Sequence, residues 1–133
     1  MDELFIDAEI KNLGELQDFV RARLDDCPPK IRNQIAIVVD EIFSNISRYA
    51  YNPPAGGVAV RMAVDGDITI EFEDSGIAFN PLAQDEPDVS LPAEERKLGG
   101  LGIFMARNIM DSMEYRRDGD KNILTIRKNR AKA

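Results

Sequence analysis

The chain has 133 residues, 44% of them apolar, a net charge of −7 and a pI near 4.6. This length suits one domain with one core, so we expect residues 1–133 to form a single domain. The negative charge would repel a nucleic-acid backbone, and no apolar run approaches the roughly 18 residues that cross a bilayer. Histidine is absent, which excludes phosphohistidine chemistry, imidazole bases and histidine metal sites on this chain.

Targeting and redox signals point to the cytoplasm. The start of the chain has no basic region followed by an apolar stretch, so it predicts no signal peptide. Cys27 is the only cysteine, so no intramolecular disulfide can form. We therefore expect a cytoplasmic protein with neither nucleic-acid nor membrane partners.

The first part of the chain predicts one strand and two helices. Residues 4–6 favour a short strand. Asn12 and Glu15 have the spacing of a helix capping box, and apolar residues then recur at helical intervals until the prolines at 28–29. A second helix is predicted from about Lys30 to Tyr51.

The remainder predicts two hairpins separated by a long loop and a helix. Alternating apolar residues flank Asp65-Gly66, and a similar pattern flanks Asp118-Gly119. Between them lie the aperiodic segment 77–98 and a helix from about Leu101 to Met113. The sum is an α+β fold, a two-layer sandwich with helices on one face of a mixed, mostly antiparallel sheet.

Two polar residues interrupt the apolar stripe of the second helix. At about 100° per residue, Asn45 falls inside the stripe and Glu41 on its edge, one turn away. They could bond to nearby backbone and simply fix packing. Alternatively they line a pocket, where Asn45 offers an oxygen to a cation such as Mg²⁺ and Glu41 accepts a proton.

Asp74 closes a predicted strand and is followed by Ser75-Gly76. A carboxylate at a strand end can accept the exocyclic amino proton of adenine, and Gly76 would let the backbone approach the ring. The alternative is an ordinary turn.

A glycine-rich stretch, Gly99-Gly100-Leu101-Gly102, opens the third helix. Free amides at a helix start attract phosphates, and a glycine within the first turn suggests close approach of another group. A flexible loop that closes onto a helix would explain Gly99 and Gly100 but not Gly102. Arg96 and Lys97 just before it could meet phosphates if the loop closes as a lid, or could merely offset neighbouring acids.

The order and spacing of these motifs resemble the nucleotide-binding boxes of the GHKL ATPase superfamily, whose ATP-binding domain is the Bergerat fold. Glu41-x-x-x-Asn45, Asp74-x-Gly76 and Gly100-x-Gly102 match its three boxes in sequence order. The small size, the absent histidine and the stretch 99–105 are most similar to its anti-sigma-factor serine kinase branch. The resemblance runs from about Leu4 to Lys128.

The resemblance implies ATP and Mg²⁺ as cofactors and assigns roles to the residues of the three boxes. Asn45 would coordinate Mg²⁺, Glu41 would be the base, and Asp74 would recognise adenine above Gly76. The glycine-rich stretch would flank the phosphates, and 77–98 would be the lid. Ala78 stands where the family often has a second glycine. This difference should restrict the motion of the lid rather than abolish binding. Asn122 replaces a common threonine, so that contact stays unassigned.

The resemblance also implies a function and partners. Members of this branch transfer phosphate to a serine of an anti-anti-sigma (STAS-type) protein, bind a sigma factor in alternation, and usually act as homodimers. A second hypothesis is a non-catalytic module in which nucleotide only sets which protein partner is held. A third, an ATPase that drives lid or dimer motion, is disfavoured because no transducer domain is visible. A domain without any ligand is the remaining alternative.

Overall fold

The computed structural model describes residues 1–51, 56–83 and 100–130. Its strands and helices are β1 Asp2–Asp7, α1 Leu13–Arg21, α2 Pro29–Tyr49, β2 Gly57–Val64, β3 Asp67–Asp74, α3 Gly100–Ile109, β4 Ser112–Asp118 and β5 Lys121–Asn129, with short 3₁₀ turns η1 Ile10–Asn12 and η2 Pro81–Ala83.

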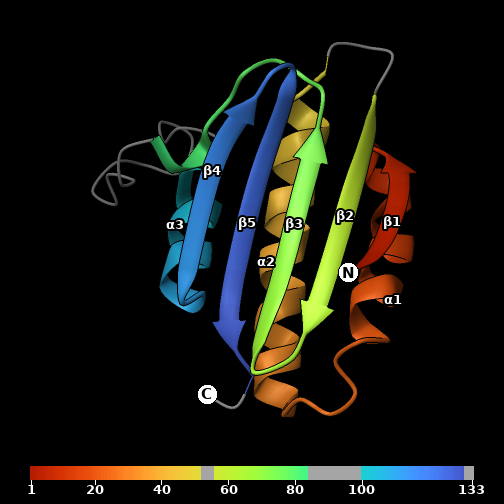
Figure 1. Ribbon diagram of the computed structural model, residues 1–133, viewed down its shortest axis with the longest axis vertical. Coiled ribbons are helices and arrows are strands. Elements are labelled where there is room, and N and C mark those ends of the chain that lie inside the picture. The colour runs from red at the N-terminus through yellow and green to blue at the C-terminus, as the bar shows by residue number, and fades with distance from the viewer. Residues whose placement is uncertain (52–55, 84–99, 131–133) are drawn as a thin grey trace.

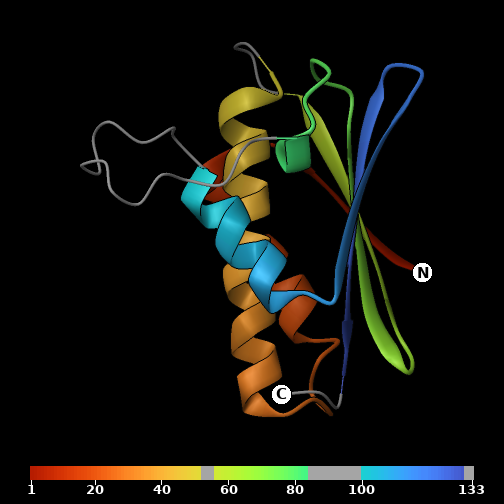
Figure 2. The same cartoon turned by 90° about the vertical axis from the view of Figure 1, so that its left-hand side faces the viewer.

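The strands form one sheet in the order β1-β2-β3-β5-β4, and each described pairing is antiparallel. The three helices lie together on one face of this sheet, with α2 behind its centre (Figures 1 and 2). The predicted two-layer α+β sandwich is therefore confirmed, with an antiparallel sheet where a mixed one was allowed for. Within the described ranges, no helix has the length and apolarity that crossing a membrane requires.

The start of α1 differs from the predicted capping box. Asn12 makes no side-chain cap bond, and its amide nitrogen instead donates to Asp7 O at 3.0 Å. The reason is the preceding 3₁₀ turn, which already places Asn12 in a near-helical backbone conformation (φ −93°, ψ 0°). A capping side chain needs extended backbone to reach back over the first turn.

The ends of α2 and α3 also shift from the predicted bounds. α2 begins at Pro29, because proline is well tolerated in the first turn of a helix. α3 ends at Ile109 rather than Met113. The Lys128 ammonium group donates to Ile109 O at 2.8 Å, which satisfies a carbonyl at the helix end, and Met113 then belongs to β4.

On β3 and β5, the side chains that face the helices are mostly apolar, with a polar residue at one or both ends of each row. In β3 every second residue is buried, namely Ile68, Ile70, Phe72 and finally Asp74. The corresponding row of β5 is Asn122, Leu124, Ile126 and Lys128. Because side chains alternate between the two faces of a sheet, Asp74 and Asn122 point to the helical side, as the core residues do.

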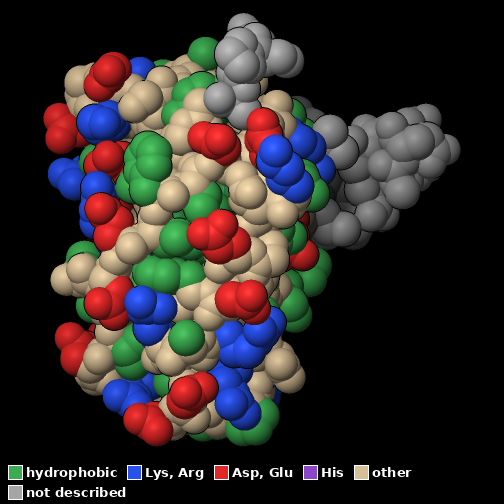
Figure 3. Space-filling model, turned by 90° about the vertical axis from the view of Figure 1, so that its right-hand side faces the viewer, with side chains coloured by type: hydrophobic (Ala, Val, Ile, Leu, Met, Phe, Trp, Pro, Cys, Tyr) green, Lys and Arg blue, Asp and Glu red, His purple; other side chains and the backbone are tan. Residues whose placement is uncertain are grey.

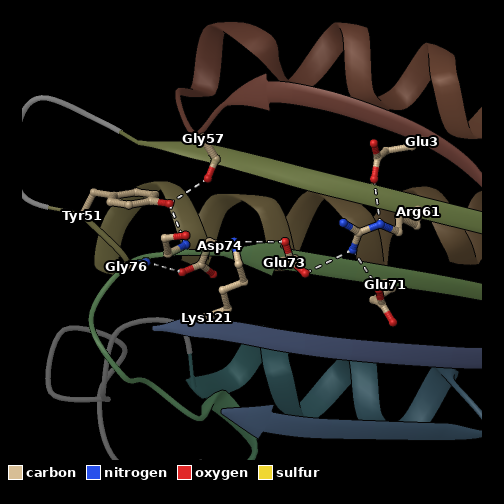
Figure 4. Close-up of polar contacts among 10 residues, drawn as sticks. Glu3, Tyr51, Gly57, Arg61, Glu71, Glu73, Asp74, Gly76 and Lys121 are labelled. Carbon is tan, nitrogen blue, oxygen red and sulfur yellow. Dashed lines mark hydrogen bonds and ion pairs between the residues drawn. The ribbon is translucent and has the colours of Figure 1, made fainter. Parts of the chain in front are cut away.

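The opposite face of the sheet is tied by ion pairs. The Arg61 guanidinium lies 2.7 Å from Glu3, 2.9 Å from Glu71 and 3.3 Å from Glu73, joining β1, β2 and β3 (Figure 4). Burial alone would raise the pKa of Glu73, but Arg61 and Lys121 outweigh it and lower that pKa. Figure 3 shows another side of the molecule, the edge at β1 and α1, where acidic and basic side chains are interspersed with apolar ones.

Candidate functional site

Asp74 is a buried carboxylate with one oxygen fully engaged. Its side chain is 6% exposed, and its Oδ1 accepts hydrogen bonds from Gly76 N and Asn122 Nδ2, both at 2.9 Å (Figure 4 shows the former). Both bonds use Oδ1, so Oδ2 is the acceptor available to a ligand. A buried carboxylate needs such partners, because leaving it without them costs several kcal/mol.

Asn122 lies directly opposite Asp74 on the neighbouring strand and is held from several sides. Its Oδ1 accepts hydrogen bonds from the Tyr115 hydroxyl, from Arg117 Nη1 at 3.1 Å and from Phe79 N at 3.3 Å. Its Nδ2 also donates to Ile77 O at 2.7 Å. These partners fix the amide so that nitrogen, not oxygen, faces Asp74.

Gly76 is needed for the packing of the turn against α2. A Cβ on Gly76 would lie 2.1 Å from Ala50 O, at the C-terminal end of that helix. Ile77 N donates to the same Ala50 O at 2.9 Å. The turn that carries Asp74 is therefore held against α2, whereas Ala78 is exposed.

Tyr51 holds the same turn from the other side. Its hydroxyl donates to Gly57 O at 2.7 Å and accepts from Ser75 N at 2.8 Å (Figure 4). Burial raises the pKa of Tyr51, so the phenol stays protonated and able to donate. Two independent contacts thus place the end of β3 relative to α2.

Asn45 and Glu41 form a hydrogen-bonded pair on α2. Asn45 is 6% exposed, and its Nδ2 donates to Glu41 Oε1 at 3.2 Å. This bond does not use Asn45 Oδ1. Burial raises the pKa of Glu41, assisted by the Asp40 charge, and outweighs Arg48 and the Asn45 bond, which lower it. A carboxylate with a raised pKa is a better proton acceptor than an exposed one.

One pocket brings Asn45, Asp74 and Asn122 together. Its cavity volume is about 40 Å³, which is room for a few water molecules. Its walls are formed by α2, α3, the sheet and η2, through Ile42, Asn45, Ile46, Ala50, Phe72, Asp74, Phe79, Pro81, Ile103, Tyr115, Asn122 and Leu124. The walls are largely apolar, and Asn45, Asp74 and Asn122 are polar groups that converge on the cavity.

Glu41 does not line this pocket but is hydrogen-bonded to Asn45, which does. It lines an adjoining groove between α2 and α3, together with Asp40, Gly102 and Met105 among others. Gly100, Leu101 and Gly102 form the first turn of α3, as the resemblance led us to expect. Arg96, Lys97 and Gly99 lie outside the described residues.

Of the residues near the pocket, the sequence reasoning left Asn122 unassigned and did not consider Tyr115. The period of two along β5 could have placed Asn122 on the core face with Leu124. Its pairing with Asp74 depends on the register between β3 and β5, which residues 48 positions apart in the chain do not reveal.

The family profile of the histidine kinase-like ATPase domain matches residues 6–128 of this chain. The chain belongs to this family. The match spans all three boxes and each described strand and helix except most of β1 and the last residue of β5. It confirms the resemblance to the GHKL superfamily.

Curated relatives of this family member include the serine-protein kinase RsbW of Bacillus cereus strain AH187. The two are 28% identical over 93 residues, which cover 66% of this chain and 58% of the relative. RsbW of Bacillus anthracis is 27% identical over an equal length. The chain therefore spans less than two thirds of the length of the curated relatives that it matches.

Solved structures show the same fold. The RsbU and RsbW domains of Rv1364c from Mycobacterium tuberculosis match with a TM-score of 0.65 and 16% identity, covering 100% of this chain and 34% of that one. The histidine kinase AdeS of Acinetobacter baumannii matches with a TM-score of 0.56 and 19% identity, covering 99% of this chain and 70% of that one. At these identities the two matches show a shared fold.

Proposed function

We propose that this protein is an ATP-dependent protein-serine kinase of the anti-sigma-factor type. It would transfer the γ-phosphoryl group of ATP to a serine of an anti-anti-sigma (STAS-type) protein and would bind a sigma factor as a regulatory switch. One observation carries the proposal: Asn45 and Asp74 face one pocket, and Glu41 is hydrogen-bonded to Asn45. Homodimer formation and a cytoplasmic location belong to the same proposal and rest on the resemblance.

Asp74 would bind the base of ATP. An adenine in the pocket would donate its amino proton to Oδ2, while Oδ1 stays with Gly76 and Asn122. The aromatic Phe79 and the apolar Ile103 in the pocket wall would exclude water from the ring.

Asn45 would hold Mg²⁺ through Oδ1, an oxygen ligand of the kind that this hard cation prefers. Among the described residues, no group of three or more acidic or cysteine side chains could hold a metal by itself. The ion would therefore bind together with the nucleotide, because Mg²⁺ commonly takes one or two protein ligands plus phosphates.

Glu41 would act as the general base. Mg-ATP supplies the phosphoryl group and neutralises charge on the phosphates when bound. Glu41 accepts the proton of the acceptor hydroxyl as the oxygen–phosphorus bond forms and the bond to ADP breaks. The Asn45 bond orients the carboxylate, so the cation ligand and the base are placed relative to each other. Gly99 to Gly102 would lie along the phosphates, with Ala78 beside the base and Arg96 and Lys97 on the lid.

The main alternative is a nucleotide-dependent binding module that transfers nothing. Incubation with γ-labelled ATP and candidate anti-anti-sigma proteins separates the two functions. The kinase proposal predicts label on a serine of the partner, whereas label that stays wholly on the nucleotide supports the binding module.

Glu41→Gln tests the base directly. Glutamine keeps the oxygen that Asn45 bonds but cannot take a proton at neutral pH, so transfer should fall about 10²- to 10⁴-fold. ATP affinity, measured by calorimetry, should change less than about threefold. Glu15→Gln is the matched control, because it makes the same change at an exposed position on another helix, α1. Unchanged transfer by Glu41→Gln would rule out Glu41 as the base.

A further inference from the structure

Gly102 leaves room for the carboxyl group of Glu41. A Cβ built on Gly102 would lie 2.0 Å from Glu41 Cδ, 2.2 Å from Oε1 and 2.3 Å from Oε2. Side-chain carbons do not approach other heavy atoms that closely, so the observed position of this carboxyl group requires a glycine here.

Gly14 provides a comparison within the same molecule. It also lies in the first turn of a helix, α1, yet a Cβ there would meet nothing within 4 Å. Glycine is a poor helix former in both places. At Gly102, unlike Gly14, a specific neighbour accounts for the missing side chain.

The contact lies in a groove that is open to solvent. Its rims are formed by Ile37 on α2 and Met105 on α3, which are 50% and 46% exposed. The Glu41 carboxyl group is thus reached from outside the helical layer, whereas Asn45, one turn along α2, lines the nucleotide pocket. The hydrogen-bonded residues Glu41 and Asn45 therefore line the groove and the pocket, respectively.

We propose that Gly102 is a positioning residue for Glu41: by lacking a side chain, it sets where the base meets the acceptor hydroxyl. This inference rests on the proposed kinase function. It assigns to this glycine of the third box a task distinct from contacting phosphates.

The lining of the groove agrees with this placement. Among the described residues, its charged members are Glu41 and Asp40, both on α2. α3 contributes Gly102, Met105 and Ala106 to the groove, none of which titrates. The first turn of α3 therefore acts on Glu41 by covering it, and a methyl group at Gly102 would push the carboxyl group outward into water.

Gly102→Ala, with Gly14→Ala as matched control, tests the proposal. The group that must yield is the end of a flexible side chain, so we expect the variant to fold and to bind Mg-ATP within about threefold of the wild type. Transfer to the partner should fall about 100-fold, since a 1 Å misplacement of a reacting group can cost that much. Gly14→Ala should transfer at the wild-type rate.

A second readout needs no activity. In the wild type, nuclear Overhauser contacts should join the Gly102 Hα and Glu41 Hγ protons. In Gly102→Ala the contacts between these two positions should weaken, because the new methyl group displaces the carboxyl group. Gly14→Ala should leave the Gly102–Glu41 contacts unchanged.

Three results would overturn the proposal. These are wild-type transfer by Gly102→Ala, a loss of nucleotide affinity that accounts for the whole loss of transfer, and the absence of the Gly102–Glu41 contact in the wild type. If the wild type transfers no phosphate, the kinase function fails. The Gly102–Glu41 contact, compared between the wild type and Gly102→Ala, then still decides whether Gly102 places Glu41.

Discussion

At the scale of single residues, Asp74 combines a structural and a binding role through its two oxygens. Oδ1 is used inside the protein by Gly76 and Asn122. Oδ2 is left for a ligand in a pocket whose walls are mostly apolar. A hydrogen bond to a charged group in such surroundings is stronger than one in water.

Asp74→Asn separates these roles. The asparagine Oδ1 can still accept from Gly76 and Asn122, so the amide nitrogen takes the place of Oδ2 and presents a donor to the donor group of adenine. We expect ATP to bind about 10- to 100-fold more weakly, which corresponds to the usual cost of a buried polar mismatch. Calorimetric titration measures this.

Asp67→Asn is the control for this change. Asp67 begins the strand that Asp74 ends, and it is exposed. It should leave ATP affinity unchanged, and equal affinities of wild type and Asp74→Asn would remove Asp74 from the base site.

Glu41 predicts a pH dependence of stability. Its pKa is raised above 4.5 in the folded chain, so between the ordinary and the folded-state pKa the folded chain holds more protons than the unfolded one. The free energy of unfolding therefore falls as pH rises through this window. Glu41→Gln has no carboxyl group to titrate at this position, so its free energy of unfolding does not fall for this reason. It should melt higher than the wild type at pH 8, with a smaller difference at pH 4.

The comparison at two pH values is the decisive part of that experiment. A wild type that melts higher than Glu41→Gln at pH 8 would show that the Glu41 charge stabilises the fold, against the burial argument. Glu15→Gln, which removes an exposed carboxylate on α1, is the appropriate reference.

Residue-level patterns in the sequence located Glu41, Asn45 and Asp74 because each interrupts a regular apolar period. The same patterns could not assign a separate role to each of these three residues. Gly76 was expected to admit a purine ring, and the structure gives it a packing reason against Ala50. Gly102 was expected to admit some close neighbour, which the structure identifies as Glu41. Such reasons depend on contacts between distant segments.

At the scale of elements, the end of α3 is stabilised by a buried lysine. Lys128 is 5% exposed and donates to Ile109 O at 2.8 Å. A cation at the C-terminus of a helix is favoured by the free carbonyls and by the helix dipole. Lys128 therefore joins α3, which carries Gly102, to the last strand.

Lys128→Met keeps the apolar stem but leaves the carbonyl without its donor. We expect the free energy of unfolding to fall by about 1–3 kcal/mol, measured by chemical denaturation. The adjacent Arg127→Met on the exposed face should cost much less. Equal effects of the two substitutions would contradict the capping role of Lys128.

Element types could be predicted from periodicity, whereas several ends could not. The stop of α3 at Ile109 depends on Lys128, which comes 19 residues later. The start of α1 depends on the η1 turn that precedes it. Both are decided by neighbours that a local helical pattern does not contain.

At the scale of the whole molecule, the layers bring the site together. The helical face of the sheet carries Asp74 and Asn122, and α2 lies across it with Asn45 and Glu41 (Figure 2). Hydrophobic patterning was enough to predict two layers and a mostly antiparallel sheet. It did not give the strand order, in which β5 lies between β3 and β4 and brings Asn122 beside Asp74.

The central claim is that the pocket between α2 and the sheet binds Mg-ATP. The most direct test is a titration of the wild-type chain with Mg-ATP, followed by backbone amide chemical shifts. We expect saturation below about 1 mM, a common upper range for enzyme substrates, with the largest shifts at Asn45, Gly76, Asn122 and Ile103. No saturable shifts, or shifts centred on β1 and α1, would contradict the account.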